Sequence, residues 1–407
     1  MSKKRIVVIG GGAAGFFGAI TAAETNSNVE VIIVEKSPNI LSKVRISGGG
    51  RCNVTHNCLD PNILVNNYPR GYKELLGPFN RFQPKDTIAW FKQKGIKLKA
   101  EADGRMFPIT DNSQTIIDCF LKSAHQLGIK LYTRTSVDEV KAVEYQKFNV
   151  SFNIGDPLIC DRVLVATGGG QSNKGFEIAQ SLGHSIVPPV PSLFTFNIED
   201  PRINDLQGLS FPDVELSVPS TALAAKGPLL ITHWGLSGPA VLKLSAWGAR
   251  ILHDLNYNFD LKINFLPHFT TESLVSELKK IKLSLKQKQV AKNLLFDLPK
   301  RFRERVVLAS GFTEAQTWSQ VPDNLIVNLA KQLTQGIYPV HGKSTNKDEF
   351  VTCGGVSLKE VNFKTMESKL CPGLHFAGEV LDIDGVTGGF NFQAAWTGGW
   401  IAGKAMC

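Results

Sequence analysis

The chain has 407 residues, of which 43% are hydrophobic and 20% charged, a balance typical of a folded globular protein. This length predicts two or three domains of about 100–200 residues each. No apolar run approaches the ~20 residues that a membrane-spanning helix needs, and glycines 10–12 interrupt the apolar stretch behind the basic N-terminus. We therefore expect no signal peptide, no membrane contact and a cytoplasmic protein. The seven cysteines are odd in number and scattered without a C-x-x-C pair, which predicts reduced thiols and no metal site.

The net charge of +9 is concentrated in one segment. From Lys279 to Arg305 there are ten Lys and Arg residues against Asp297 and Glu304, a net charge of +8, which leaves +1 for the rest of the chain. A solvated helical face is the simpler interpretation of segment 279–305. Nucleic-acid binding through this segment is the alternative that the charge leaves open.

The first 35 residues predict a nucleotide-binding unit. An apolar strand at 7–9 leads into Gly10, Gly12 and Gly15, which fit G-x-G-x-x-G at the start of an apolar helix. A second strand at 29–34 ends in Glu35, 20 residues after Gly15. A carboxylate at this offset accepts hydrogen bonds from an adenosine ribose and disfavours a 2′-phosphate. The strand, glycine turn, helix and acid together predict the ADP end of a dinucleotide.

The next part of the chain continues the same α/β pattern. Helices are predicted at 84–94 and from Asn112 or Ser113 onward, and a strand pair follows at 130–153. Residues 161–170 form a strand that runs into a second glycine-rich turn, and a helix then ends near Gly183. Prolines at 188, 189 and 191 cannot lie in a helix or a central strand, so the segment 187–196 is a crossing between domains.

The pattern changes after this crossing and returns near the C-terminus. Residues 192–265 alternate as β-strands do, residues 270–335 have helical periodicity, and strand and glycine character resumes near Phe350. The simplest organisation is one α/β domain made from both ends of the chain. Its insert has a β part and a helical part.

The C-terminal stretch 374–405 identifies the dinucleotide. A strand at 374–377 is followed by Gly378-Glu379, a loop with Asp382 and Asp384, the pair Gly388-Gly389 and an apolar helix from about Phe390. These acids suit ribityl or pyrophosphate-side hydroxyls, and the helix N-terminus suits the negative charge of reduced flavin. Because the chain has a single complete G-x-G-x-x-G, we expect FAD as the resident cofactor and NAD(P)H as a transient reductant.

Six blocks of the sequence resemble a known family: IGGGAAG (9–15), KVRISGGGRCNVT (43–55), ATGG (166–169), THWGLSGPAVLKLS (232–245), TCGGVSLKEV (352–361) and the long block 365–403. The chain is identified as a member of the bacterial NAD(P)/FAD-dependent oxidoreductases, also known as the aminoacetone oxidase family, which includes the flavoprotein that reduces 3-dehydro bile acids. The resemblance implies a glutathione-reductase-like, Rossmann-type FAD-binding domain at 1–190 and 346–407. It also implies a β-barrel-like subdomain at 191–270 and 336–345 and a helical subdomain at 271–335.

The resemblance also implies which residues contact FAD. Carried over position by position, they are Gly10, Gly12, Ala13, Ala14, Gly15, Glu35, Lys36, Lys43, Gly48, Gly49, Gly50, Arg51, Cys52, Val137, Thr167, Gly168, Gly378, Glu379, Asp382, Gly388, Gly389, Phe390 and Asn391. Two departures limit the transfer of a substrate. The loop GQSNKG at 170–175 is shorter than in many relatives, and His56 stands where an Asn is common.

The catalytic residues are less well defined. Arg51 suits the pyrophosphate or an anionic substrate group, or it anchors its own loop. Cys52 has no partner at C-x-x-C spacing and is best interpreted as a packing residue. His233 is a candidate proton donor to a reduced substrate or a structural histidine at a β-turn, His56 is a weaker candidate, and His375 alternates with apolar residues as in a core strand.

The sequence therefore predicts an FAD-dependent oxidoreductase. In the leading hypothesis, NAD(P)H reduces the flavin, which passes a hydride to a small enone or carbonyl compound. A flavin-dependent RNA-modifying enzyme is the second hypothesis, because segment 279–305 is basic, and a non-enzymatic redox sensor is the third. The acid–base residue and the oligomeric state stay unassigned.

Overall fold

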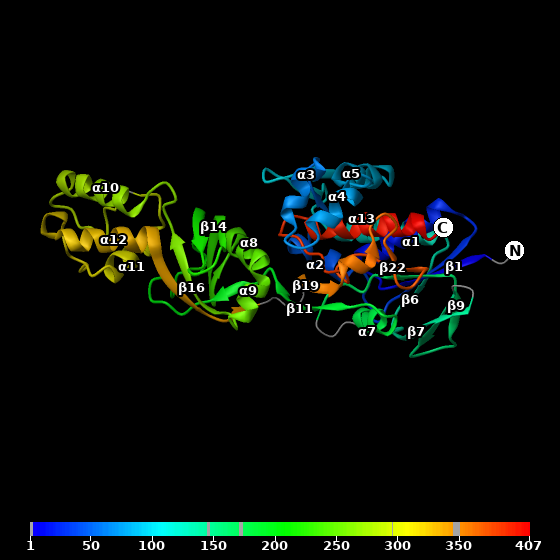
Figure 1. Cartoon of the computed structure of the whole chain (residues 1–407). Coiled ribbons are helices and arrows are strands. Elements are labelled where there is room, and N and C mark those ends of the chain that lie inside the picture. Colours follow the sequence, from blue (N-terminus) through cyan, green and yellow to red (C-terminus); the bar gives the residue numbers. More distant parts are fainter. Residues whose placement is uncertain (1–2, 145–146, 171–173, 295, 345–350) are drawn as a thin grey trace. The chain divides into compact units, whose positions relative to one another are not determined.

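The computed structural model describes residues 3–144, 147–170, 174–294, 296–344 and 351–407 (Figure 1). The chain divides into two compact units. Unit 1 comprises Met1–Ser192 and Lys347–Cys407, so both ends of the chain build it, and unit 2 is the insert Leu193–Asn346. In the described part of the chain, no helix is long and apolar enough to cross a bilayer.

The centre of unit 1 is a seven-stranded sheet in the order β20-β21-β22-β10-β1-β2-β6. Its parallel strands are β1 (Lys4–Ile9), β2 (Val29–Val34), β6 (Lys130–Tyr132), β10 (Arg162–Val165) and β22 (Leu374–Phe376). The short strands β20 (Val361–Asn362) and β21 (Glu367–Ser368) extend one edge in antiparallel fashion. The strand order reverses between β1 and β10, which is where doubly wound folds bind nucleotides.

Two glycine-containing helices of unit 1, α1 (Ala13–Thr25) and α13 (Phe390–Ala405), lie side by side (Figure 1). A Cβ on Gly399 would lie 2.6 Å from the Ala14 carbonyl oxygen, and a Cβ on Gly403 would lie 2.5 Å from that of Gly18. The pairs advance together along both helices, so the helices run parallel. Both N-termini therefore face the same end of unit 1.

The rest of unit 1 is inserted between these elements. Between β2 and β6 are α2 (Ser42–Gly50), α3 (Pro61–Leu64), η1 (Val65–Asn67), α4 (Tyr72–Phe79), α5 (Pro84–Gln93), α6 (Gln114–Gln126) and the small sheet of β3 (Thr55–His56), β5 (Arg105–Pro108) and β4 (Leu98–Ala100). A meander of β7 (Val137–Val143), β8 (Lys147–Phe152) and β9 (Leu158–Cys160) precedes β10, and α7 (Lys174–Ser181) follows it. Strand β11 (Ile186–Ser192) pairs with β19 (Val351–Val356), and η4 (Leu358–Glu360) precedes β20.

The proline-rich crossing lies in this last ribbon. The register between β11 and β19 shifts between Val187 and Val190, at the position of the two adjacent prolines. Since proline cannot donate to a ladder, a two-stranded ribbon with an irregularity accommodates it where a central strand would not. The chain enters unit 2 directly after Ser192.

Unit 2 contains a second seven-stranded sheet, in the order β17-β16-β13-β14-β15-β12-β18. Its strands are β12 (Thr195–Asn197), β13 (Ser210–Ser217), β14 (Ala224–Thr232), β15 (Gly235–Ser237), β16 (Asn258–Asn264), β17 (Gly336–His341) and β18 (Lys343–Ser344). The first and last strands of this order are one extended segment, interrupted only at Gly342 with a φ of +137°. The sheet therefore closes into a barrel, which confirms the expected fold class, and α8 (Pro239–Trp247) and α9 (Ala249–Asp254) pack beside it.

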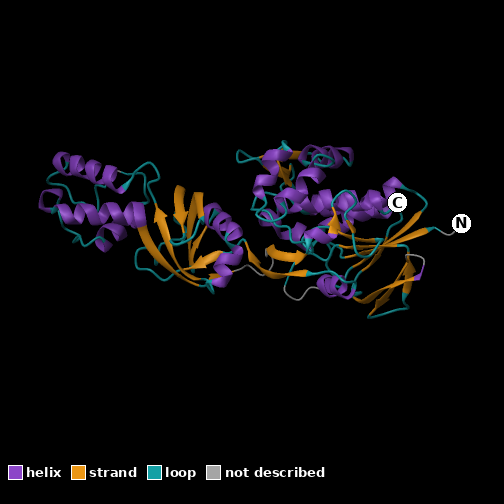
Figure 2. Cartoon of the chain, in the orientation of Figure 1, coloured by secondary structure: helices purple, strands orange, loops and turns teal. Residues whose placement is uncertain are grey.

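The helices α10 (Thr271–Ser284), α11 (Lys300–Ala309) and α12 (Asp323–Gln335), with η3 (Trp318–Gln320), form the helical part of unit 2 (Figure 2). They share one continuous hydrophobic core with the barrel. Phe302 of α11 packs against Phe211 and Phe265, with ring centroids 4.9 and 4.5 Å apart. This shared core holds the basic segment 279–305 on a fixed support.

Candidate cofactor and active site

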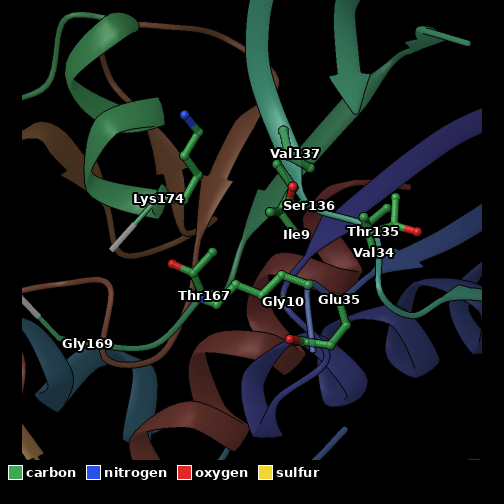
Figure 3. Close-up of a pocket in the computed structure, with 11 residues that line it drawn as sticks. Ile9, Gly10, Val34, Glu35, Thr135, Ser136, Val137, Thr167, Gly169 and Lys174 are labelled. Atoms are coloured by element: carbon green, nitrogen blue, oxygen red, sulfur yellow. The ribbon is translucent and has the colours of Figure 1, made fainter. Parts of the chain in front are cut away.

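The carboxyl ends of four parallel strands bring the predicted cofactor residues of unit 1 together. Gly10 follows β1, Glu35 follows β2, Thr167 and Gly168 follow β10, and Gly378 follows β22. A cavity of about 110 Å³ lies among the ends of β1, β2, β7 and β10. Figure 3 shows Gly10, Glu35 and Thr167 at this cavity, together with Ser136 and Val137 from the start of β7 and Lys174 from α7.

The first glycine turn is held by close backbone packing. A Cβ on Gly10 would lie 2.4 Å from the Ala166 carbonyl oxygen, and a Cβ on Gly15 would lie 2.0 Å from that of Gly10. At Gly12 a Cβ would meet no atom within 4 Å, because this residue borders open space as the N-cap of α1. No side chain caps this helix, so its first N–H groups are available to an anion.

Glu35 is fixed by two backbone donors. One carboxylate oxygen accepts a 2.8 Å hydrogen bond from the Gly11 N–H, and the other accepts a 2.8 Å hydrogen bond from the Ser37 N–H. Each oxygen keeps a lone pair for a further donor. A carboxylate held in this way, at the edge of the cavity, suits the two hydroxyls of an adenosine ribose.

A second cavity of about 260 Å³ continues from the first. The two cavities share Gly10, Glu35, Lys36, Thr167 and Gly169, so they form one trough. The second cavity also reaches Gly12, Ala13, Ala14, Lys43, Gly168, Gly378, Glu379 and Asn391. This trough links the adenosine end to the N-terminus of α13, as an extended dinucleotide requires, and its residues fit FAD.

Lys43 and Glu379 connect the two sides of this trough. Lys43 Nζ lies 2.6 Å from a carboxylate oxygen of Glu379, although these residues come from α2 and from the turn after β22. The pair is partly exposed, so it contributes little to folding and chiefly fixes where each charge lies. The ammonium group is therefore positioned beside the cavity that the pyrophosphate region of FAD would occupy.

The pair Gly388-Gly389 packs against the segment that contains the candidate catalytic residues Arg51 and His56. Gly389 has a φ of +87°, and a Cβ there would lie 2.6 Å from the Thr55 carbonyl oxygen. The Asn391 side chain accepts from the Gly385 N–H at 2.8 Å and donates to the Gly385 carbonyl at 2.9 Å. The loop that carries Asp382 and the start of α13 are thus one locked structure.

An aromatic pair packs beside the turn at Gly388-Gly389. The rings of His56 and Phe390 stack with centroids 4.7 Å apart and an interplanar angle of 21°. The buried Tyr68 hydroxyl donates to the Phe390 carbonyl at 2.6 Å. Partial burial lowers the pKa of His56, and its Nε2 lies 3.0 Å from the Asp103 carbonyl oxygen, so the neutral ring donates there. His56 therefore positions Phe390.

Arg51 and Cys52 have structural contacts. Arg51 lies 2.6 Å from a carboxylate oxygen of Glu101 and 3.6 Å from one of Asp111, and its guanidinium stacks on Phe107 at 3.9 Å. These contacts favour the loop-anchoring role over a phosphate-binding one. Cys52 is buried with a φ of +63°, and burial raises the pKa of its thiol to about 12, which favours a packing cysteine. All seven cysteines are free.

The remaining histidines lie in different environments. His375 is buried in β22, where burial lowers its pKa to about 4, as suits a core residue. His233 is exposed in the turn between β14 and β15, beside Trp234, whose exposed fraction is 72%. His233 belongs to unit 2, whereas the candidate FAD residues belong to unit 1.

Sequence reasoning missed several residues of the site. Thr135, Ser136 and Lys174 border the first cavity, but no local pattern marks them. The sequence marks Asp384 only as an acid in a loop. It is fully buried, its carboxylate is paired with Arg70, whose Nε lies at 2.5 Å, and it accepts from the Ser192 hydroxyl at 2.7 Å. Burial raises the pKa of Asp384 to about 6, although Arg70 opposes this effect.

The parallel sheet, the glycine turn at α1, the carboxylate at the end of β2 and the trough toward α13 define a flavoprotein that binds FAD. The model of the HI0933-like protein Rossmann domain family matches residues 4–405, and the chain belongs to this family. The protein is accordingly an FAD-dependent oxidoreductase, as the sequence predicted.

Curated relatives cover nearly the whole chain. The ribosomal RNA dihydrouridine synthase of Escherichia coli K12 is 31% identical, with 100% of this chain and 98% of the relative aligned. The 3-dehydro-bile acid delta(4,6)-reductase of Clostridium scindens is 27% identical over 98% of each chain. Among solved structures, the 3-ketosteroid-delta4-(5alpha)-dehydrogenase of Rhodococcus jostii has a TM-score of 0.53 at 13% identity, covering 100% of this chain and 97% of that one. The last similarity shows the fold alone.

Proposed function

We propose that this protein is a cytoplasmic reductase that saturates a carbon–carbon double bond conjugated to a carbonyl, with uridine of ribosomal RNA as substrate and NAD(P)H as reductant. The balance is NAD(P)H plus a proton plus uridine giving NAD(P)⁺ plus dihydrouridine. The observation that carries the proposal is the 31% identity to a ribosomal RNA dihydrouridine synthase along the entire chain. The basic segment 279–305 supports a polyanionic substrate.

The names of the two relatives describe one kind of chemistry. The C5=C6 bond of uracil is conjugated to a ring carbonyl, and a delta(4,6)-reductase of a 3-oxo compound acts on double bonds of the same class. This agrees with the enone-type acceptor expected from the sequence. The RNA substrate, which the sequence left as the second hypothesis, becomes the leading one. The redox-sensor hypothesis is set aside because the protein is an enzyme of this family.

The residues of unit 1 hold and orient the cofactor. When bound, FAD supplies hydride transfer between a nicotinamide and an electron-poor carbon. The N–H groups at the start of α1 and the ammonium of Lys43 bind the phosphates, and Glu35 binds the adenosine ribose. The N-terminus of α13 provides positive potential at the other end of the trough, on a turn that Asn391 fixes.

A proton must reach the substrate carbon that does not receive the hydride. Of the two histidine candidates from the sequence, His233 has the exposed ring, and we keep it as the candidate proton donor. The ring of His56 is stacked on Phe390 and bonded to Asp103, so it has a supporting role. A donor placed at the reacting carbon typically contributes 10²–10⁴-fold to the rate.

The test is the formation of dihydrouridine in protein-free ribosomal RNA by the holoenzyme with NADPH or NADH, measured by mass spectrometry of nucleosides. We expect product with at least one nucleotide, together with anaerobic bleaching of the flavin band. Flavin that bleaches while the RNA stays unchanged would contradict the assigned substrate.

The second candidate function is the reduction of a small enone. The specific observation in its favour is the 27% identity to the bile-acid reductase over 98% of both chains. Reduction of a 3-oxo-Δ4 steroid, together with no dihydrouridine formed in the RNA, would favour this candidate. Formation of dihydrouridine without reduction of the steroid would favour the first. Both measurements use the same reduced enzyme, so they discriminate directly.

A further inference from the structure

Between residues 286 and 305, the helical part of unit 2 has exposed cations that form no ion pair with a described carboxylate. They are Lys286, Lys288, Lys292, Lys300 and Arg305, which we name the free-cation surface. Within the described residues, none of the five forms an ion pair. Neighbouring lysines differ, because Lys279 lies 2.7 Å from Asp323 and Lys280 lies 3.0 Å from Glu277. The helical part thus separates into a neutralised portion on α10 and a charged portion after it.

The backbone beneath the first two cations is fixed. Residues 286–290 run beside 316–320, with hydrogen bonds of 2.9 Å from the Ser319 N–H to the Lys286 carbonyl and 3.1 Å from the Trp318 N–H to the Lys288 carbonyl. Lys286 and Lys288 are two residues apart, and both are exposed. Because Trp318 is fully buried below them, this stretch presents its charges from an ordered support.

A hollow of about 500 Å³ opens beside these residues. Lys292, Arg301 and Arg305 line it, together with the carboxylates Glu304 and Glu314, and in the described part of the chain neither carboxylate pairs with the three cations. Arg301 is held in place by donating to the Asp205 carbonyl. The hollow therefore offers separate donors to an oxyanion rather than a closed internal salt bridge.

The core does not need these charges. Phe302 and Val306 turn inward from α11 and are fully buried, while Lys300 and Arg305 turn outward. Unpaired like charges concentrated in residues 286–305 repel one another, and a ligand with regularly spaced phosphates relieves that repulsion while releasing its own counterions. The chain outside 279–305 carries a net charge of only +1, so the segment that contains these cations is the main source of attraction to a polyanion.

We propose that the free-cation surface is the RNA-docking surface of this enzyme, binding backbone phosphates at a site separate from the cofactor trough. This inference rests on the proposed function and adds where the RNA is held. Binding through phosphates fixes register without reading sequence, so recognition of the target uridine is left to the rest of the protein.

The test variant is Lys288→Gln, Lys292→Gln, Arg305→Gln in the full-length holoenzyme. The matched control, Lys226→Gln, Lys279→Gln, Lys280→Gln, removes the same charge from exposed residues of unit 2 that are each paired with a carboxylate. The readouts are the Kd for a labelled RNA hairpin across a KCl series, the KM and kcat for dihydrouridine formation in protein-free ribosomal RNA, and flavin bleaching by NADPH.

We expect the test variant to bind the hairpin about 30-fold more weakly at physiological salt, with a salt slope smaller by about 2–3, and the control to change both far less. The KM for RNA should rise, whereas kcat and the rate of flavin bleaching should stay unchanged. Equal Kd, slope and KM in the test variant and the wild type would overturn the docking surface, as would wild-type binding to anionic phosphatidylserine vesicles but not to RNA.

The failures of the two proposals are distinguishable. If wild-type enzyme forms dihydrouridine and the test variant does so with unchanged KM, the docking surface is wrong and the proposed function stands. If wild-type enzyme binds the hairpin through these residues but modifies no ribosomal RNA, the docking surface stands and the assigned substrate is wrong.

Discussion

Two groups of charged residues differ in how they are arranged: ion pairs of unit 1 that join distant segments, and the free-cation surface of unit 2. Three ion pairs of unit 1 hold its segments together: Lys43 with Glu379 at the cofactor trough, Arg51 with Glu101, and Arg70 with the buried Asp384. Each pair joins segments far apart in sequence, so it fixes geometry. In the helical part of unit 2 the free-cation surface lies on a finished core and is available to a partner. Paired charges fix the geometry of a site, whereas unpaired charges are available to bind a charged partner.

The largest effect on folding is expected where a paired charge is buried. Arg70→Met leaves the fully buried Asp384 carboxylate without its cation, which costs about 3–5 kcal/mol at pH 8. The matched change on the free-cation surface, Lys292→Gln, should leave stability unchanged. Urea unfolding and the temperature of flavin release, measured for both variants, test this contrast. Equal stability of the two variants would contradict the claim that the Arg70–Asp384 pair stabilises the fold and that Lys292 does not.

The pH dependence of Arg70→Met follows from Asp384. The pKa of this carboxyl is about 6 when folded, above its ordinary value of 3.8, so the folded state binds more protons between these values. Its ionised form is therefore disfavoured by folding, and the stability it contributes falls as pH rises through this window. Without Arg70 the pKa rises further. The deficit of Arg70→Met should thus shrink as pH falls through about 6, and a deficit independent of pH would contradict this account.

A change at His233 of unit 2 tests the candidate proton donor and should leave the cofactor site of unit 1 intact. His233→Gln removes the candidate proton donor from an exposed turn, and if this imidazole protonates the substrate, kcat for dihydrouridine should fall about 100-fold. FAD content and flavin bleaching by NADPH should match the wild type. The control is His253→Gln, another exposed histidine of unit 2. Unchanged kcat in His233→Gln would leave the proton donor unassigned.

The sequence predicted the parts of the site that local patterns determine. Local backbone requirements set the spacing of the turn at Gly10–Gly15, the offset of Glu35 and the pair Gly388-Gly389. These features can therefore be recognised from the sequence alone. The parallel packing of α1 on α13 was not predictable, because Gly399 and Gly403 carry no pattern that names their partners. The acid facing Arg51 is 50 residues away, and the connection after β6 brings Thr135 to the cavity only once the sheet has formed.

The helix pairing gives a smaller, directional prediction. Gly399→Ala adds a Cβ 2.6 Å from the Ala14 carbonyl oxygen, which must separate α1 from α13 at a cost of about 1–3 kcal/mol. Because the two N-termini border one trough, FAD affinity should fall as well. Gly398→Ala is the matched control in the same helix: a Cβ there would lie 3.4 Å from the Met366 side chain, an ordinary contact, so stability should rise by about 0.5–1 kcal/mol. Effects of the same sign in both variants would refute the packing argument.

The smallest effect is expected at Arg51, and it decides between the two roles that the sequence left open. Arg51→Met keeps an extended side chain over Phe107 but loses the contacts with Glu101 and Asp111. If Arg51 anchors its loop, the temperature of flavin release falls slightly, and the Kd for FAD and the KM for RNA stay at wild-type values. Lys43→Met is the comparison variant, because its ammonium borders the trough and its loss should weaken FAD binding. A Kd for FAD that rises as much in Arg51→Met as in Lys43→Met would instead assign the guanidinium to the pyrophosphate, and would mean that the contact with Glu101 opens when the cofactor binds.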